Sequence, residues 1–344
     1  MTGLKSIGQG GAGDALWAAA RPSLRLVHDA KAERPAAAAL RVIEQLSHRG
    51  PRPSLNPAEA RRRYAESRKP LLARMETIES IIHVRPPIDQ APSMTVIRPF
   101  GQPAGDPLPA IVYFHGGGWT VGDIASYEPF CRQLANATGS TVIYVDYRLA
   151  PEHPFPAAFD DARRALRWVR ENYAWLGVDP IRIGVGGDSS GGNLAAAVCL
   201  AERNDAVACL PAFQLLLYPA LDMMACMPSH KELASGYLLT GELYGWYRQN
   251  YLGRFEKPRH WRLSPLFAHD VGGLPPAVIL YAGFDPLRDE AAAYAGRLRD
   301  AGVATETLFF PDMIHGFLTM GGAIPTAGVA IARIAKLLDG LNLD

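Results

Sequence analysis

The chain has 344 residues, of which 48% are hydrophobic and 20% are charged, proportions typical of a globular protein and not of a disordered or fibrous one. Its 35 Lys and Arg residues balance 34 Asp and Glu residues, so the net charge is +1. Such a chain has no overall field to attract nucleic acid or an anionic membrane, and we expect neither as a partner.

The N-terminal stretch, residues 1–35, is rich in Gly, Ala and Pro and lacks periodicity, which predicts a poorly ordered tail. Gly8-Gln-Gly10-Gly-Ala-Gly13 matches the dinucleotide pattern G-x-G-x-x-G, but no strand is expected before it. We therefore predict no cofactor there. The first residues contain no apolar signal region and no run approaches about 18 apolar residues, so a cytoplasmic protein is expected.

Four cysteines, Cys131, Cys199, Cys209 and Cys226, form no C-x-x-C pair and have no metal-ligand spacing with histidine. They predict buried, small apolar side chains in a reducing compartment. Neither a disulfide framework nor a metal site is expected.

Two helices are predicted in the N-terminal region, over residues 35–47 and 56–77. Asn56 is the expected N-cap of the second, because Pro57 follows it and Glu59 lies three residues on. The arginines of the second helix favour a solvated amphipathic face over a nucleic-acid patch, given the neutral charge. The expected apolar positions are Leu40, Ile43 and Leu46 in the first helix and Leu71, Leu72 and Met75 in the second.

From Met94 onward, short β-branched and aromatic runs alternate with helical stretches, such as Phe159–Tyr173 and Asn193–Arg203. This alternation predicts an α/β fold with a mostly parallel sheet covered by helices on both faces. The expected strands are Met94–Ile97, Ile111–Phe114, Thr141–Asp146, Ile181–Val185, Phe213–Leu217, Val278–Tyr281 and Thr305–Phe309.

Residues 222–262 interrupt the alternation with an aromatic-rich helical segment. Ser229 and Glu232 form an expected capping box, and Thr240 is the expected cap of a second helix. An insertion of this kind predicts a lid, although its aromatics could equally pack against the body. The expected domains are an N-terminal tail with cap helices (1–90), a catalytic body (91–221 and 263–344) and the insertion that completes the cap (222–262).

The clearest chemical signal is Gly187-Asp188-Ser189-Ser190-Gly191, a G-x-S-x-G between a predicted strand and a predicted helix. A serine on such a turn projects above the sheet, and the glycines allow the close approach of backbone that the turn requires. We predict that Ser189 is a nucleophile. The alternative is an inert serine in a glycine turn.

A second signal, His115-Gly116-Gly117-Gly118-Trp119, follows another predicted strand. Glycines at this point leave backbone N–H groups accessible to an oxyanion, whereas the alternative is a structural turn. A serine nucleophile also needs a base and an acid, which follow it in the order acid and then histidine in this kind of fold. His315 suits the base, and the residues alone leave both Asp285 and Asp222 as the acid.

Five motifs together resemble the hormone-sensitive-lipase-like esterases of the α/β-hydrolase fold, in particular the bacterial branch with Asp before the serine. The resemblance extends from about Leu55 to the end of the chain and implies the triad Ser189, Asp285 and His315. It implies oxyanion donors on Gly117, Gly118 and Ser190, with Gly116 supporting them. The motifs are His115–Trp119, Asp146-Tyr-Arg-Leu-Ala-Pro-Glu152, Gly187–Gly192, Asp285-Pro-Leu-Arg-Asp-Glu290 and His315-Gly-Phe317.

The resulting prediction is a serine carboxylesterase that cleaves short-to-medium acyl esters and uses neither a cofactor nor a metal. Trp119, Tyr237 and Trp246 are expected to line the substrate pocket, with Asp188 and Glu290 in supporting positions. An amidase or formamidase with the same triad and a non-catalytic ligand-binding protein of this fold are the alternatives. A small-molecule ester is the expected partner, and a homodimer is a further expectation.

Overall fold

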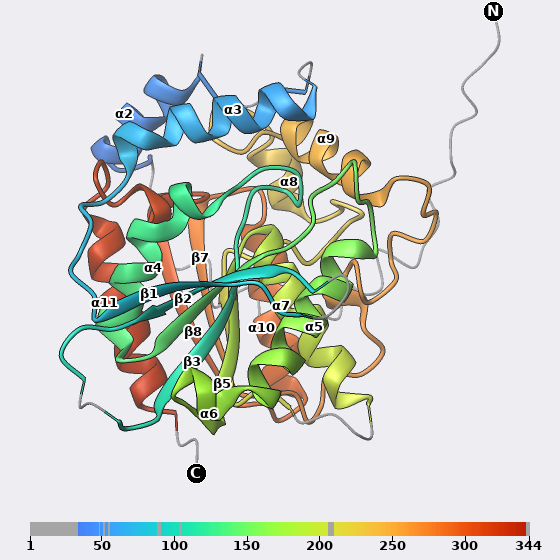
Figure 1. The fold of residues 1–344 in the computed structure, drawn as a ribbon. Coiled ribbons are helices and arrows are strands. Elements are labelled where there is room, and N and C mark those ends of the chain that lie inside the picture. The colour runs from blue at the N-terminus through green and yellow to red at the C-terminus, as the bar shows by residue number, and fades with distance from the viewer. Residues whose placement is uncertain are drawn as a thin grey trace, which may run out of the picture.

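The computed structural model describes residues 34–47, 49–50, 52–53, 56–87, 91–102, 105–205 and 210–341. The predicted tail, its glycine pattern at 8–13 and Cys209 lie outside the described residues. The predicted α/β class is confirmed, because an eight-stranded sheet forms the centre of the molecule (Figure 1). Its strands are β1 (Ser80–Val84), β2 (Ser93–Arg98), β3 (Leu108–Phe114), β4 (Thr141–Asp146), β5 (Val178–Asp188), β6 (Gln214–Leu217), β7 (Ala277–Phe284) and β8 (Thr305–Ile314).

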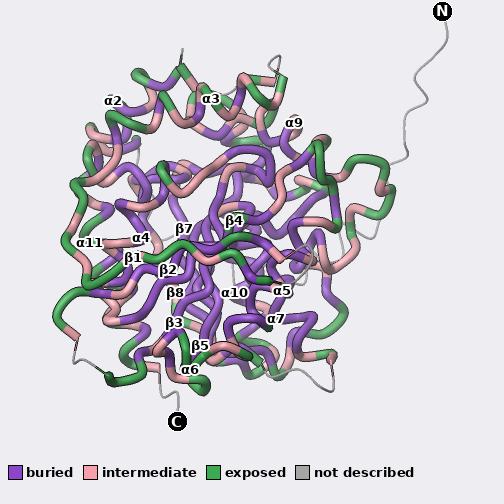
Figure 2. Tube along the Cα trace, viewed as in Figure 1, coloured by how far each residue is buried: buried purple, intermediate pink, exposed green. Residues whose placement is uncertain are grey.

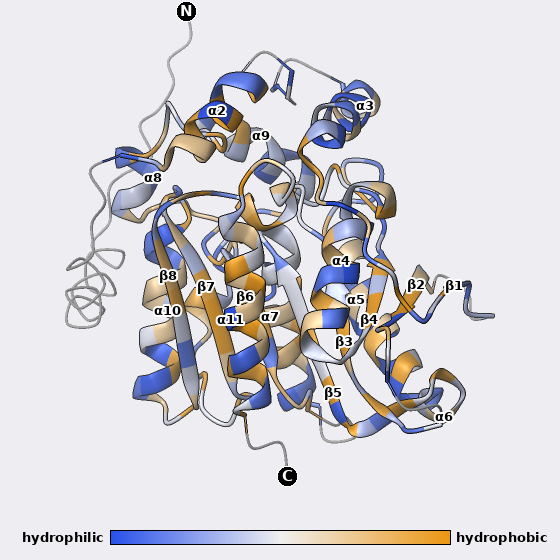
Figure 3. Cartoon of the chain, turned by 90° about the vertical axis from the view of Figure 1, so that its left-hand side faces the viewer, coloured by the Kyte–Doolittle hydropathy of each residue, from blue (hydrophilic) through white to orange (hydrophobic). Residues whose placement is uncertain are grey.

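The strand order is β1-β2-β4-β3-β5-β6-β7-β8. Strands β3 to β8 run parallel to one another, whereas β2 is antiparallel to both β1 and β4. Apolar residues follow the central strands, and these strands are buried along most of their length (Figures 2 and 3). Burial on both faces explains why apolar runs identified seven of the strands from sequence.

Helices cover both faces of the sheet. Helices α4 and α11 pack together on one face, and α5, α7 and α10 lie on the other (Figure 1). The remaining helices α2, α3, α8 and α9 lie beyond the carboxyl ends of the parallel strands. The helices are α2 (Ala37–Leu46), α3 (Pro57–Arg68), α4 (Ile124–Thr138), α5 (Ala157–Glu171), α6 (Tyr173–Leu176), α7 (Ser190–Arg203), α8 (Pro228–Glu232), α9 (Gly241–Leu252), α10 (Arg288–Asp300) and α11 (Thr326–Asp339), with 3-10 turns at Lys69–Leu71, Pro265–Phe267 and Phe317–Met320.

The N-terminal helices follow the prediction at their starts and depart from it at their apolar faces and ends. The Asn56 side chain accepts the Glu59 amide at 2.9 Å, which confirms the predicted cap. The predicted end at residue 77 is wrong, because α3 stops at Arg68 and Pro70 supplies no N–H to continue it. Met75 is consequently exposed, and Leu40 of α2 is exposed as well.

Three further expectations are corrected by the structure. Strand β1 was not predicted, because it is an edge strand whose alternate residues remain exposed. The Ser229–Glu232 capping box is wrong, since Ser229 lies inside α8 and its hydroxyl donates to the Pro286 carbonyl at 2.7 Å. Cys226 is exposed and donates its thiol to Asp222, whereas Cys131 and Cys199 are buried as expected. The described helices include none with the length and apolar character of a membrane span.

Candidate active site

Ser189 lies on a tight turn between β5 and α7. Its φ of 54° and ψ of −117° place it in a region that side chains rarely adopt. The flanking glycines make this turn sterically feasible: a Cβ on Gly187 would lie 2.6 Å from the Phe114 carbonyl oxygen, and one on Gly191 would lie 2.7 Å from that of His115. The motif therefore places the serine hydroxyl above the carboxyl edge of the sheet.

His315 bridges the serine and an acid. Its Nε2 lies 2.9 Å from Ser189 Oγ, and its Nδ1 lies 2.7 Å from Asp285 Oδ2. The acid follows β7, is fully buried, and accepts the Leu287 amide through its other oxygen at 2.8 Å. A carboxylate at Nδ1 holds the proton on that nitrogen, so Nε2 is free to accept the serine proton.

Asp222, the other acid that the residues left open, does not contact His315. One of its oxygens accepts the Met224 amide at 2.7 Å, and the other accepts the Cys226 amide at 2.9 Å. Both oxygens are thus used within the loop after β6. The structure brings together Ser189, Asp285 and His315, and it leaves Asp222 outside this group.

The glycine loop after β3 lies beside the serine. Gly117 and Gly118 have φ values of 111° and 59°, which favour glycine. A Cβ on Gly118 would also lie 2.6 Å from the Cβ of Tyr247 in α9. Among the described residues, no acceptor is bound by the backbone N–H of Gly117, Gly118 or Ser190. These three donors are available to a ligand.

Asp188 fixes the position of this loop. Its carboxylate accepts the Gly116 amide at 2.8 Å and the hydroxyls of Tyr113 at 2.9 Å and Tyr127 at 3.0 Å. Burial raises the pKa of Asp188, and these three donors oppose the rise. The residue before the nucleophile thus links β5, the glycine loop and α4. The two tyrosines were not anticipated from the sequence, since they lie at unremarkable positions on β3 and α4.

His115 packs beneath the same loop. Its ring stacks on Tyr147 at a centroid distance of 4.3 Å, and the Tyr147 hydroxyl donates to the His115 carbonyl at 2.7 Å. Burial lowers the pKa of His115 to about 4, against the opposing hydrogen bond with the Gly116 carbonyl, so the ring is neutral. This histidine therefore packs and positions the loop from below.

A cavity of about 410 Å³ opens over Ser189 and His315. Trp119 and Tyr237 line it as predicted, and Trp119 is held there by stacking on Tyr251 at 4.5 Å. Trp246 does not line this cavity, so that prediction is wrong. Its ring packs on Tyr247 instead, which lines the cavity together with Tyr244 of the same helix. Helices α2 and α3 also contribute to the lining with Ile43, Leu46, Tyr64 and Arg68, none of which was predicted from the sequence as a pocket residue.

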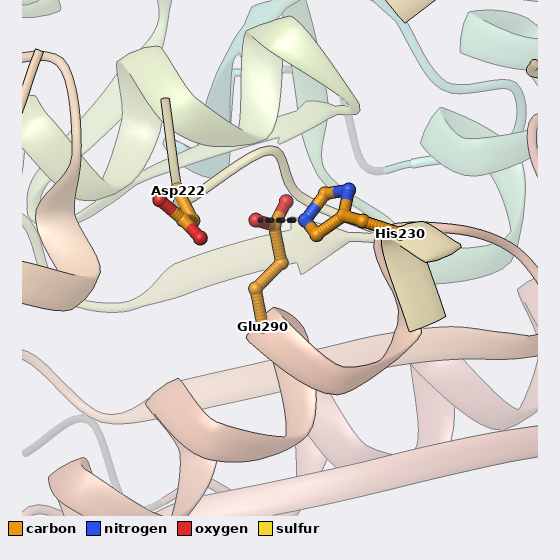
Figure 4. A group of neighbouring side chains, drawn as sticks. All are labelled: Asp222, His230 and Glu290. Carbon is orange, nitrogen blue, oxygen red and sulfur yellow. Dashed lines mark hydrogen bonds and ion pairs between the residues drawn. The ribbon is translucent and has the colours of Figure 1, made fainter. Parts of the chain in front are cut away.

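Glu290 belongs to a separate buried group with Asp222 and His230 (Figure 4). The Glu290 carboxylate accepts the Leu221 amide at 3.0 Å and lies 3.3 Å from His230 Nε2. Burial raises the pKa of Glu290 to about 7, although the His230 contact lowers it. Each carboxylate oxygen of Asp222 and Glu290 already has a partner within the protein. These contacts explain why the three side chains lie together, and we assign the group no metal. Glu290 connects α10, which begins just after Asp285, to α8.

Comparison with other proteins places this geometry in context. A family model described as the alpha/beta hydrolase fold matches residues 111–319. The carboxylic ester hydrolase LipN of Mycobacterium tuberculosis is 43% identical over 228 residues, which are 65% of this chain and 60% of LipN. The ethyl acetate hydrolase of Pseudomonas putida is 35% identical over 293 residues, 84% of this chain and 91% of that protein.

The solved structures agree with the sequence relatives. An α/β hydrolase enzyme from the metagenome of Lake Arreo, Spain, is 37% identical and superposes with a TM-score of 0.85. The superposition covers 90% of this chain and 99% of that one.

Proposed function

The chain belongs to the hormone-sensitive-lipase-like carboxylesterases of the α/β-hydrolase fold, and from this premise we propose that it cleaves short-to-medium acyl esters through an acyl-enzyme on Ser189. The observation that supports the proposal most directly is the position of His315. It lies within hydrogen-bond distance of Ser189 on one side and Asp285 on the other, in the floor of the cavity.

In the proposed reaction, Ser189 Oγ attacks the ester carbonyl carbon while His315 Nε2 takes the hydroxyl proton. Asp285 holds the imidazole in position and stabilises the imidazolium that forms. The tetrahedral intermediate then collapses, and His315 gives the proton to the departing alcohol. Water, deprotonated by the same nitrogen, attacks the acyl-enzyme and releases the acid.

The backbone N–H groups of Gly117, Gly118 and Ser190 are the proposed oxyanion donors. They have no acceptor among the described residues, and Ser190 begins α7, whose N-terminal dipole favours negative charge. The loss of one such donor typically costs about 3 kcal/mol of transition-state stabilisation. Asp188 supports this arrangement by binding the Gly116 amide.

Helices α2, α3, α8 and α9 act in this proposal as a cap over the cavity, whereas β1, although it lies in the region expected to form the cap, belongs to the sheet. Its apolar lining includes Ile43 and Leu46 of α2 and Leu243 of α9. A volume of about 410 Å³ is near the lower end of the range of roughly 300–1,000 Å³ that is usual for ligand pockets. This size favours short-to-medium acyl groups.

The test is a panel of 4-nitrophenyl esters from acetate to palmitate, measured on the wild type and on Ser189→Ala, with Ser80→Ala as a matched control at an exposed strand end. We expect a maximum at short-to-medium chains and a loss of at least about 10⁴-fold in Ser189→Ala alone. Serine-independent rates would contradict the mechanism. Faster cleavage of a matched 4-nitroanilide would identify an amidase instead.

A further inference from the structure

Arg68, the last residue of α3, lines the cavity and has no carboxylate partner among the residues that the structure describes. It is among the lining residues, and its Nη1 atom is buried without a hydrogen bond. Within the described parts of the chain, its guanidinium forms no ion pair, and its contact is with the ring of Tyr64, 5.0 Å from Cζ. Arg68 is half-buried, and the part of its guanidinium that is withdrawn from water has no counter-ion, which is unfavourable.

The other arginines of α3 show that unpaired cations are not general in this helix. Arg61 pairs with Glu152 at 2.6 Å, and Arg62 and Arg63 pair with Glu59 at 2.7 and 3.1 Å. Each therefore has a carboxylate partner from the protein. Arg68 differs from them both in its lack of a carboxylate and in its position over the cavity.

The carboxylates near the cavity are not available to Arg68. Asp188 already accepts three hydrogen bonds, and Asp285 is occupied by His315 and a backbone amide. Glu242 also lines the cavity but is exposed at its rim, and it forms no ion pair with Arg68. A ligand with an anionic group in the cavity would supply the acceptor that these carboxylates do not.

The guanidinium lies next to the reacting groups. A Cβ built on Gly316, the residue after His315, would lie 3.8 Å from Arg68 Nη2 and 3.9 Å from Nη1. Gly316 also has a φ of 76°, so this position favours glycine, and residue 316 places no side chain beside the guanidinium. An anion bound by Arg68 would thus lie a few bonds from an ester carbonyl held at Ser189.

We propose that Arg68 determines specificity by binding a carboxylate carried by the ester substrate itself. The proposal rests on the esterase function proposed above and specifies its substrate class: esters with a free carboxylate a few bonds from the scissile bond. A guanidinium suits this role because it offers two parallel N–H groups to one carboxylate. The apolar lining contributed by α2 and α9 accommodates the rest of the molecule.

Two matched substrate pairs test the proposal and show which side of the ester carries the charge. Ethyl hydrogen succinate and ethyl succinamate differ only in a carboxylate or an amide on the acyl side. O-Acetylglycolate and O-acetylglycolamide differ in the same way on the alcohol side. The quantity measured is the ratio of kcat/KM for the acid to that for the amide, in wild type and in Arg68→Met, Arg68→Lys and Arg62→Met.

We expect the ratio to fall by about tenfold or more in Arg68→Met for one pair, to fall less in Arg68→Lys, and to stay unchanged in Arg62→Met. The pair that responds identifies the acyl or alcohol side. Unchanged ratios for both pairs in Arg68→Met would overturn the proposal, even if both esters were cleaved. Failure of the wild type to cleave any neutral ester would instead refute the esterase function, so the two failures are distinguishable.

A binding measurement checks the same point without turnover. In Ser189→Ala, ethyl hydrogen succinate and O-acetylglycolate are titrated by calorimetry, with and without Arg68→Met. We expect one of the two acids to bind at least about tenfold more weakly without the guanidinium. If Arg68→Met left the affinity for each of the two acids unchanged, the proposal would be overturned. Thermal unfolding of each variant confirms folding; Arg68→Met should not destabilise the protein, because the side chain it removes has no hydrogen bond to lose.

Discussion

The floor and the roof of the cavity are built differently. The floor is connected by short hydrogen bonds between rigid elements: Asp188 accepts three of them, and His315 joins two. The roof contains an unpaired cation, Arg68, and is held mainly by ring contacts and apolar side chains. The floor comprises the lining residues Gly117, Gly118, Asp188, Ser189, Ser190 and His315, with Gly116 and Asp285 hydrogen-bonded behind them, and the roof comprises Ile43, Leu46, Tyr64, Arg68, Tyr237, Leu238, Leu239, Thr240, Leu243, Tyr244 and Tyr247.

This difference separates two tasks. Ester chemistry needs atoms held to within tenths of an ångström, which a hydrogen-bonded floor on strand ends can provide. Substrate choice needs only shape and charge, which individual roof side chains can supply without disturbing the chemistry. Changes in the floor should therefore affect all esters alike, and changes in the roof should affect some esters more than others.

Asp285→Asn tests the floor most severely. The amide cannot hold the imidazole tautomer that accepts the serine proton, so kcat should fall by about 10⁴-fold for every ester. The measurement compares 4-nitrophenyl acetate and octanoate, with Asp300→Asn at the exposed end of α10 as the control. A loss restricted to one of the two esters would break the distinction between floor and roof.

Gly118→Ala affects the junction of floor and roof. The added Cβ overlaps the Tyr247 ring, and the φ of 59° disfavours alanine, so the donor should shift away from the oxyanion. We expect kcat to fall by about 10²-fold for both ester lengths. Gly245→Ala is the matched control, because nothing lies within 4 Å of its Cβ position. An unchanged kcat in Gly118→Ala would remove Gly118 from the proposed oxyanion donors.

Tyr237→Ala tests the roof alone. Its ring lines the cavity and lies 5.1 Å from that of Phe284, so its removal enlarges the pocket and leaves the triad intact. The octanoate-to-acetate ratio of kcat/KM should rise by about three- to tenfold. Tyr173→Ala, at an exposed tyrosine in α6, should leave this ratio unchanged. Equal losses for both esters would place Tyr237 with the floor.

Glu290→Gln should affect stability and leave the ester ratio unchanged. Burial raises the pKa of Glu290 from 4.5 to about 7, so between these values the folded protein keeps a proton that the unfolded chain has released. The free energy of unfolding should therefore fall as pH rises through this window, by on the order of 1–3 kcal/mol, and the substitution should reduce that fall.

Urea unfolding at pH 5 and pH 8 measures this effect, with Glu306→Gln on the exposed side of β8 as the control. The pKa of His230 is also raised, because its contact with Glu290 outweighs its burial, so it adds a change of the same sign. An equally steep pH dependence in Glu290→Gln would show that this carboxyl is not its source.

The sequence was sufficient for the floor because its signals are local. The glycines around Ser189 and after His115 stand together in short motifs, although most of the contacts that require them are with residues far away in the chain, and strands buried on both faces give continuous apolar runs. The roof depends on helix rotation, which short segments do not encode. Trp246 and Tyr247 are adjacent in the sequence, yet only Tyr247 faces the cavity.

Charge pairing was equally inaccessible from the sequence. Arg61 and Arg68 lie in one helix, and nothing in their local pattern distinguishes a residue paired with Glu152 from one without a partner. The edge strand β1 was missed because its residues remain partly exposed, which leaves a weak pattern. Contacts between segments far apart in the chain account for each of these cases.

The close approach of Tyr247 to Gly118 has a consequence for recombination between related enzymes. Helix α9 is in contact with the loop that carries the proposed oxyanion donors Gly117 and Gly118, at a point where a Cβ would not fit. A chimera that exchanges residues 222–262 alone would place a foreign side chain on that glycine. Residues 115–119 and 241–252 should therefore come from the same parent enzyme, and we expect an active chimera only when both segments are transferred together.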